Sequence, residues 1–174
     1  FFFSCSEFEK KTEKELAQEK FGDIPLVEYK PSPNPDKNAY FGDLHVHTEN
    51  SFDAYTFGTT ASPADAYKYA RGEAIKHPTG YHIQLSRPLD FYAVTDHGVF
   101  LGVVKEAADP NSEIGQYELT KPLHNMNENI SNSIFSIIRR AGTFRPFAQK
   151  LANSIRDGTV DMKILQKVMN DTWL

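Results

Sequence analysis

The sequence has few cysteines and no long apolar run. Cys5 is the only cysteine among 174 residues, so an internal disulfide framework is excluded. No stretch approaches the run of about 18 apolar residues that a membrane-spanning helix needs. Hydrophobic residues still make up 40% of the chain, which is enough for a buried core, and the length predicts one domain.

An excess of positive charge is also missing. The 19 lysines and arginines are outnumbered by 23 aspartates and glutamates, which gives a formal net charge of −4. The basic residues are scattered along the chain, so no basic stripe is available to neutralise a phosphate backbone. We therefore expect no nucleic-acid partner.

The position of Cys5 suggests a lipid anchor. An apolar run, a small residue, a cysteine and a polar tether resemble the end of a bacterial lipoprotein signal peptide, although Phe2 stands where leucine is commonest. Lipidation of Cys5 would make the protein a periplasm-facing lipoprotein of the bacterial cell envelope, with its acyl chains as the only membrane contact. The alternative is an arbitrary fragment start with an exposed thiol, since neither an initiating methionine nor a basic segment precedes Cys5.

The first 39 residues are expected to lie outside the folded domain. We interpret residues 1–20 as a signal-peptide remnant and a charged tether, because acids and bases alternate there. Residues 21–39 are predicted to be an extended linker, since three prolines near their end fix φ and remove backbone donors. The domain should then comprise a first βαβ part over 40–110 and a truncated helical insertion over 111–174.

Two segments have the patterns of β-strands. Residues 42–48 alternate, which places Leu44 and Val46 on one face and the polar side chains on the other. Residues 89–95 are almost continuously apolar, as expected of a strand covered on both faces in a parallel sheet.

A helix is predicted between the two strands, over residues 62–71. Ser62 is its N-cap, Pro63 occupies the first helical position, and Asp65 completes a capping box. Residues 72–88 are expected to form a loop or a short hairpin. Strand, helix and strand together predict an α/β fold.

The last third of the chain has helical spacing. Three helices are predicted: one over 130–141 that stops at Gly142, one over 147–155 that follows Pro146 and stops at Gly158, and one around 164–168. We expect them to pack over one end of the α/β unit.

Histidines and a carboxylate at the strand ends predict a metal site. His45 and His47 project from the same side of a strand, and histidine is the commonest ligand for zinc and similar ions. A polar turn can bring Asp53 back over the end of that strand, and His97 follows the second strand. Because the C-terminal ends of parallel strands meet at one rim, we expect these four residues to converge.

The two motifs resemble a known family. FGDLHVHTENSFDA (41–54) and RPLDFYAVTDHG (87–98) are similar to the PHP superfamily, named for polymerase and histidinol phosphatase domains, and most similar to the domain of unknown function 3604. The resemblance implies the N-terminal part of a distorted (β/α)7 barrel with a helical insertion. It also implies two or three divalent ions (zinc, manganese or iron) at the C-terminal rim.

The resemblance assigns roles to individual residues. His45 and His47 match ligands of the first motif, His97 matches the ligand of the second motif, and Asp53 matches an acidic ligand that lies one residue closer to the histidines in many members. Two further acids stand beside the histidines, and we expect them to support the ligands by accepting an imidazole N–H; they are Asp43 and Asp96.

The leading functional hypothesis is a metal-dependent, phosphoesterase-like hydrolase. A metal-bound hydroxide would attack a small-molecule substrate, such as a phosphoester. No later glutamate or closing Asp-x-His pair is recognisable after His97, so we expect the remaining ligands beyond residue 174 and little activity from this chain alone. The alternatives are a non-catalytic, metal-stabilised envelope binding module and a hydrolase of a non-phosphate bond.

Overall fold

The computed structural model describes residues 32–128, 130 and 133–173. The predicted lipidation of Cys5, the tether over 1–20 and most of the linker over 21–39 lie outside these residues. Within the described part of the chain, no helix is long and apolar enough to cross a membrane.

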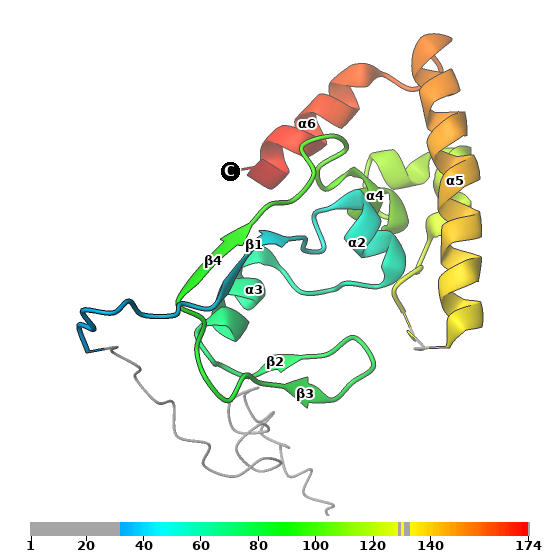
Figure 1. Ribbon diagram of the computed structural model, residues 1–174. Helices are drawn as coiled ribbons and strands as arrows, with labels where there is room; N and C mark the ends of the chain where they lie inside the picture. The colour runs from blue at the N-terminus through cyan, green and yellow to red at the C-terminus, as the bar shows by residue number, and fades with distance from the viewer. Residues whose placement is uncertain (1–31, 129, 131–132, 174) are drawn as a thin grey trace, which may run out of the picture.

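Two parallel strands form the frame of the site. Strand β1 (Gly42–Val46) pairs with β4 (Phe91–Val94), with Gly42 opposite Phe91 and Val46 opposite Val94. The pairing confirms both predicted strands and their parallel arrangement. The C-terminal ends of the two strands therefore lie side by side (Figure 1).

The segment between these strands also follows the sequence pattern. Helix α3 (Pro63–Ala70) begins with the predicted capping box, in which the Asp65 N–H donates to Ser62 Oγ at 3.1 Å and the Ser62 N–H donates to Asp65 Oδ2 at 3.3 Å. Strands β2 (Ile75–Lys76) and β3 (His82–Ile83) then form a short antiparallel hairpin. The general α/β class is thus confirmed.

Several short elements have no counterpart in the predicted set. They are α2 (Phe52–Phe57), α4 (Val103–Ala108) and two 3₁₀ helices, η1 (Ile114–Gln116) and η2 (Glu118–Leu123). Helix α2 ends at Gly58, whose φ of 106° is left-handed. Asp53 consequently lies in the first turn of a helix, and not in the polar turn that the sequence suggested.

The helical segment is simpler than predicted. Helix α5 (Ile134–Arg156) runs without interruption through Gly142 and Pro146, and α6 (Met162–Trp173) follows it. The prediction of two helices over α5 was therefore wrong. A proline inside a helix crowds the residue four positions earlier, which here is Gly142. Among the described residues, no other group lies within 4 Å of the position that a Cβ would take at Gly142, so the helix has room at this point.

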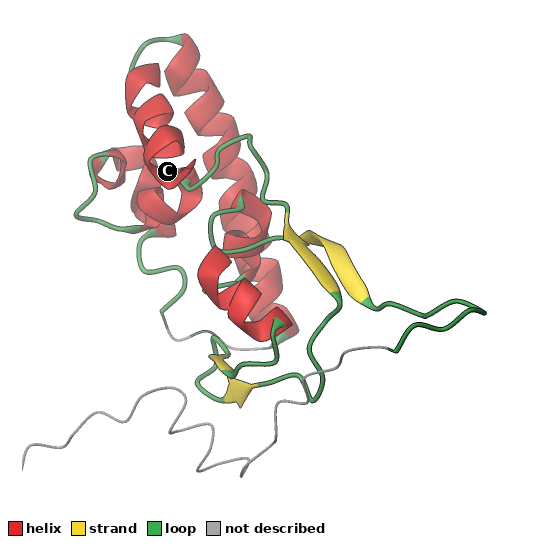
Figure 2. Cartoon of the chain, turned by 90° about the vertical axis from the view of Figure 1, so that its left-hand side faces the viewer, coloured by secondary structure: helices red, strands yellow, loops and turns green. Residues whose placement is uncertain are grey.

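The core lies among the helices. Its buried residues come from α4, η1, η2, α5, α6 and the turn before α6, and Figure 2 shows the helices gathered with the β1–β4 pair beside them. In contrast, Leu44 on β1 is 63% exposed and Phe91 on β4 is 43% exposed. The expectation that the second strand is covered on both faces was wrong for the described residues.

Candidate metal centre

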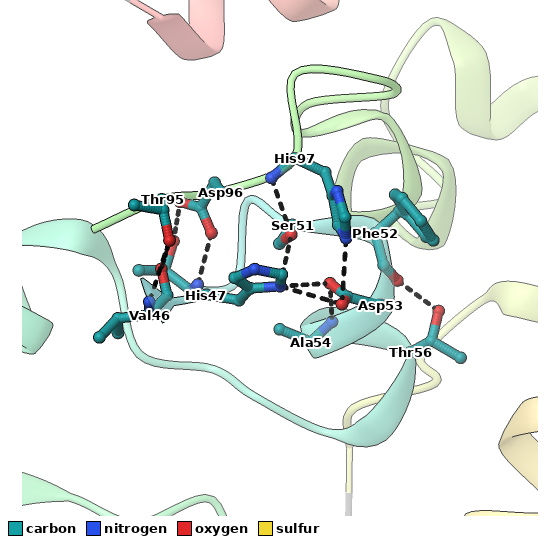
Figure 3. Close-up of polar contacts among 11 residues, drawn as sticks. Val46, His47, Ser51, Phe52, Asp53, Ala54, Thr56, Thr95, Asp96 and His97 are labelled. Atoms are coloured by element: carbon teal, nitrogen blue, oxygen red, sulfur yellow. Dashed lines mark hydrogen bonds and ion pairs between the residues drawn. The ribbon is translucent and has the colours of Figure 1, made fainter. Parts of the chain in front are cut away.

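Three side chains converge where β1 and β4 end. The carboxylate of Asp53 lies 2.9 Å from His47 Nδ1 and 3.3 Å from His97 Nε2, both measured to Oδ2 (Figure 3). One ligand atom from each residue lies within 4.8 Å of the other two. The group is partly open, because the His97 side chain is 45% exposed while that of His47 is 16% exposed.

Local structure explains the convergence. His47 follows β1 directly, His97 stands three positions after the end of β4, and Asp53 is the second residue of α2. The parallel pairing places both strand ends at one edge, and the turn from β1 into α2 brings the carboxylate between the two imidazoles. This is the geometry predicted from the strand ends.

His45 lies next to this group without being part of it. Its ring stacks on the ring of His47, with centroids 4.9 Å apart and planes inclined by 19°. Of the four predicted ligands, the structure thus brings three together and places the fourth beside them.

Two buried hydroxyl residues support the site. Ser51 is fully buried, lies 3.4 Å from His47 Nδ1 through its Oγ, and accepts a hydrogen bond from the His97 N–H at 3.1 Å. Thr48 is 1% exposed. Sequence reasoning missed both residues, because a serine or threonine in a polar turn is usually solvated, and its burial depends on contacts with the second strand.

The two acids beside the histidines do not make the contacts we expected. Asp96 accepts hydrogen bonds from the Thr48 N–H at 2.5 Å and from Thr48 Oγ1 at 2.6 Å. Asp43 accepts from the backbone N–H of His45 at 2.9 Å. Each carboxylate therefore fixes the backbone of the β1 segment, and their support of the ligands is through the main chain and not through an imidazole N–H.

An aromatic stack connects the site to α5. The Phe52 ring stacks on His97 with ring centroids 4.7 Å apart, and it also stacks on Phe144 of α5 with centroids 5.6 Å apart. The Phe144 and Phe147 rings in turn have centroids 6.4 Å apart, and Phe147 is buried in the core. The His97 ring is therefore anchored through side chains that the motif alone did not identify.

The electrostatics of Asp53 favour an ionised carboxylate. Burial by itself raises the pKa of Asp53, but hydrogen bonds from Ser51, from the Ala54 N–H and from His47 outweigh it and lower the pKa below its usual value. The Ala54 N–H donates to Oδ1 at 2.7 Å. Asp53 is thus available as an anionic ligand at neutral pH.

Two other histidines and two arginines have local partners. His77 contacts Thr79 and stacks on Tyr81 within the hairpin, and His124 lies 2.9 Å from the Gly115 carbonyl oxygen. Arg71 donates to Glu73, and Arg87 lies 3.6 Å from Asp90. None of these four side chains belongs to the group formed by His47, Asp53 and His97.

Comparison with known proteins gives one result. No curated protein and no solved structure matches the chain. A family model matches residues 34–174, a range that includes both strand motifs and also the helices α5 and α6. The helical segment is therefore part of the sequence that this family shares, and the chain belongs to the DUF3604 family of proteins of unknown function.

Proposed function

We propose that this chain carries the metal-binding part of a metal-dependent hydrolase that acts on phosphoesters. His47, Asp53 and His97 would hold a divalent ion, with His45 as a neighbouring ligand. The observation that carries the proposal is the convergence of these three ligands at the C-terminal ends of two parallel strands.

The donor set suits such an ion. Two imidazole nitrogens and one carboxylate are ligands of catalytic zinc, for which a protein commonly supplies three ligands and leaves one position open. Zinc, manganese and iron all accept this combination of nitrogen and oxygen donors. The partial exposure of His97 and Asp53 leaves a path for an ion and a substrate.

Each protein group would have a defined task. Asp53 supplies the negative charge, and the Ala54 N–H fixes its orientation. Ser51 holds the backbone of His97 close to the ring of His47, while Phe52 fixes the plane of the His97 ring. Bound divalent ions would add Lewis acidity and lower the pKa of a coordinated water toward about 7.

The resemblance to PHP proteins extends the proposal. It implies a distorted (β/α)7 barrel with two or three ions, of which β1, α3 and β4 would be the first βαβ unit. The parallel pairing of β1 and β4 supports this interpretation. The phosphoester substrate rests on the same resemblance.

Zinc and manganese titration by calorimetry tests the metal site. We expect His47→Ala, Asp53→Asn and His97→Ala each to weaken binding by at least about tenfold, because each removes one ligand. His124→Gln is the matched control, since His124 contacts the Gly115 carbonyl away from the site. Equal affinity in all four variants and the unaltered chain would exclude the site.

The reaction class needs a separate experiment. The native protein that contains this chain, loaded with metal, is assayed on a panel of phosphomonoesters, phosphodiesters and sulfoesters. Hydrolysis of a phosphoester that requires metal and is lost in Asp53→Asn supports the proposal. Metal-dependent cleavage of sulfoesters alone would replace it with a non-phosphate hydrolase.

A non-catalytic role is favoured by one observation. The site is tied to the core through the stack of Phe52 and Phe144, so a bound ion would brace α2 and the segment after β4 against α5. If metal binds tightly and raises the melting temperature without turnover of any ester, the protein is a metal-stabilised binding module.

A further inference from the structure

Arg140 is a buried charge on α5. Its side chain is only 3% exposed, and arginine is rarely buried unless it is paired. Nη1 donates to Asn127 Oδ1, and Nη2 donates to the Met126 carbonyl oxygen at 2.8 Å. Both acceptors are neutral, so these hydrogen bonds leave the positive charge without a counterion.

Within the part of the chain that the structure describes, no carboxylate pairs with Arg140. Burial lowers the pKa of Arg140, and the charge of neighbouring Arg139 lowers it further, yet a guanidinium keeps its proton in proteins. A buried charge that lacks an ionic partner is costly. An anion beside it would remove that cost.

Arg140 lines a groove that could hold such an anion. The groove, of about 480 Å³, lies between the C-terminal end of α2, the β2–β3 hairpin and α5. This volume is in the range of small-molecule sites. Its wall is largely apolar, with Phe57, Ile75, Ile83 and Ile137, while Lys76 adds a second cation and none of the described residues that line it is acidic.

The guanidinium has hydrogen-bond donors that these two partners do not use. Arginine has five N–H donors, and the two hydrogen bonds to Asn127 and Met126 occupy two of them. Gly58 faces the guanidinium, since a Cβ on this residue would lie 3.4 Å from Nη1. Gly58 and the side chain of Ile130 therefore border the guanidinium where it lines the groove.

We propose that this groove binds a small organic anion, with a carboxylate against Arg140 and an apolar body along the isoleucines. The negative charge of the ligand is inferred from the two cations that line the groove, Arg140 and Lys76. Its apolar body is inferred from the apolar side chains of the groove wall. The groove residues do not include His47, Asp53 or His97. The proposal therefore stands whether or not the metal centre is confirmed.

Sodium octanoate is a suitable probe, used in calorimetric or NMR titration of the full chain. We expect one octanoate molecule to bind per chain. The affinities of 1-octanol and of inorganic phosphate should be at least about tenfold lower, because octanol lacks the negative charge and phosphate lacks the apolar body. Arg140→Gln should weaken octanoate binding by about tenfold or more. Arg145→Gln, at an exposed arginine five positions further along the same helix, should leave it unchanged.

A second variant tests the proposal independently if Arg140→Gln does not fold. Ile137 is 37% exposed and lies three positions before Arg140 on the groove wall. Ile137→Glu therefore places a carboxylate where we expect the carboxylate of the ligand. We expect it to fold and to lose octanoate binding about tenfold. Absent octanoate binding, equal binding of octanol or phosphate, or an unchanged affinity in Ile137→Glu would overturn the proposal.

Discussion

At the scale of single residues, Ser51 connects the two halves of the candidate metal centre. It is the one described side chain that contacts both the His47 ring and the His97 backbone, and it is fully buried. Groups that orient ligands influence affinity almost as strongly as the ligands themselves. The site therefore depends on the Ser51 hydroxyl, which contacts both histidines.

We expect Ser51→Ala to weaken zinc binding by roughly tenfold while all three ligands remain. The loss comes from freeing the His97 backbone and the His47 ring, and calorimetric titration measures it. Ser86→Ala, at an exposed serine of the loop before β4, is the matched control. An affinity unchanged by Ser51→Ala would mean that the ligands hold their geometry without this hydroxyl.

Among the elements, α3 is the one that the sequence describes most completely. Its capping box depends only on residues three positions apart, so the pattern of Ser62, Pro63 and Asp65 was sufficient to place its start. Helix α5 was not predictable in the same way. Gly142 and Pro146 are helix-ending signals taken alone, and the packing of Phe147 and Leu151 in the core overrides them.

The capping box makes α3 sensitive to pH. Burial by itself raises the pKa of Asp65, but hydrogen bonds from Ser62 and Lys68 outweigh it, so the pKa lies below its ordinary value. A lowered folded-state pKa means that ionised Asp65 stabilises the fold above the ordinary aspartate pKa of about 3.9. That contribution is lost as the pH falls through the lowered pKa of the folded state.

We therefore expect Asp65→Asn to reduce the free energy of unfolding by about 1 kcal/mol at pH 7. The difference from the unaltered chain should shrink as the pH drops through the acidic range and vanish below the lowered pKa. Urea unfolding at several pH values measures it. Asp36→Asn, at an exposed aspartate outside any helix, is the control, and a difference that stays constant at low pH would contradict the assignment.

The stack between α5 and the site gives a second prediction at this scale. Phe144→Ala should weaken zinc binding several-fold, because the Phe52 ring loses its support and no longer fixes the ring of His97. Phe135→Ala is the matched control on the same helix, since Phe135 is 80% exposed. Phe144→Leu, which keeps an apolar contact with Phe52, should restore part of the affinity. If both variants lower stability but leave zinc affinity intact, the stack has a purely structural role.

For the whole molecule, the sequence predicted the site better than the core. Two parallel strands place His47 and His97 at one edge by topology alone, and the turn into α2 needs only local geometry to add Asp53. The core depends on contacts between α4, α5 and α6 that no short pattern encodes. The exposure of Leu44 and Phe91 follows from the same cause, because the apolar pattern of a strand does not say which element covers it.

This arrangement predicts how metal affects overall stability. The three candidate ligands come from the residue after β1, from α2 and from the segment after β4, so an ion bound by all of them joins elements that must separate on unfolding. At a zinc concentration of about 100 times the Kd, binding to the folded state alone adds about 2.7 kcal/mol. For a chain of this length we expect a rise in melting temperature of roughly 5–10 °C, reversed by a chelator. His47→Ala, which we expect to weaken binding by at least about tenfold, should show at most about half of this rise at the same zinc concentration, and a rise of equal size would place the stabilising ion elsewhere in the protein.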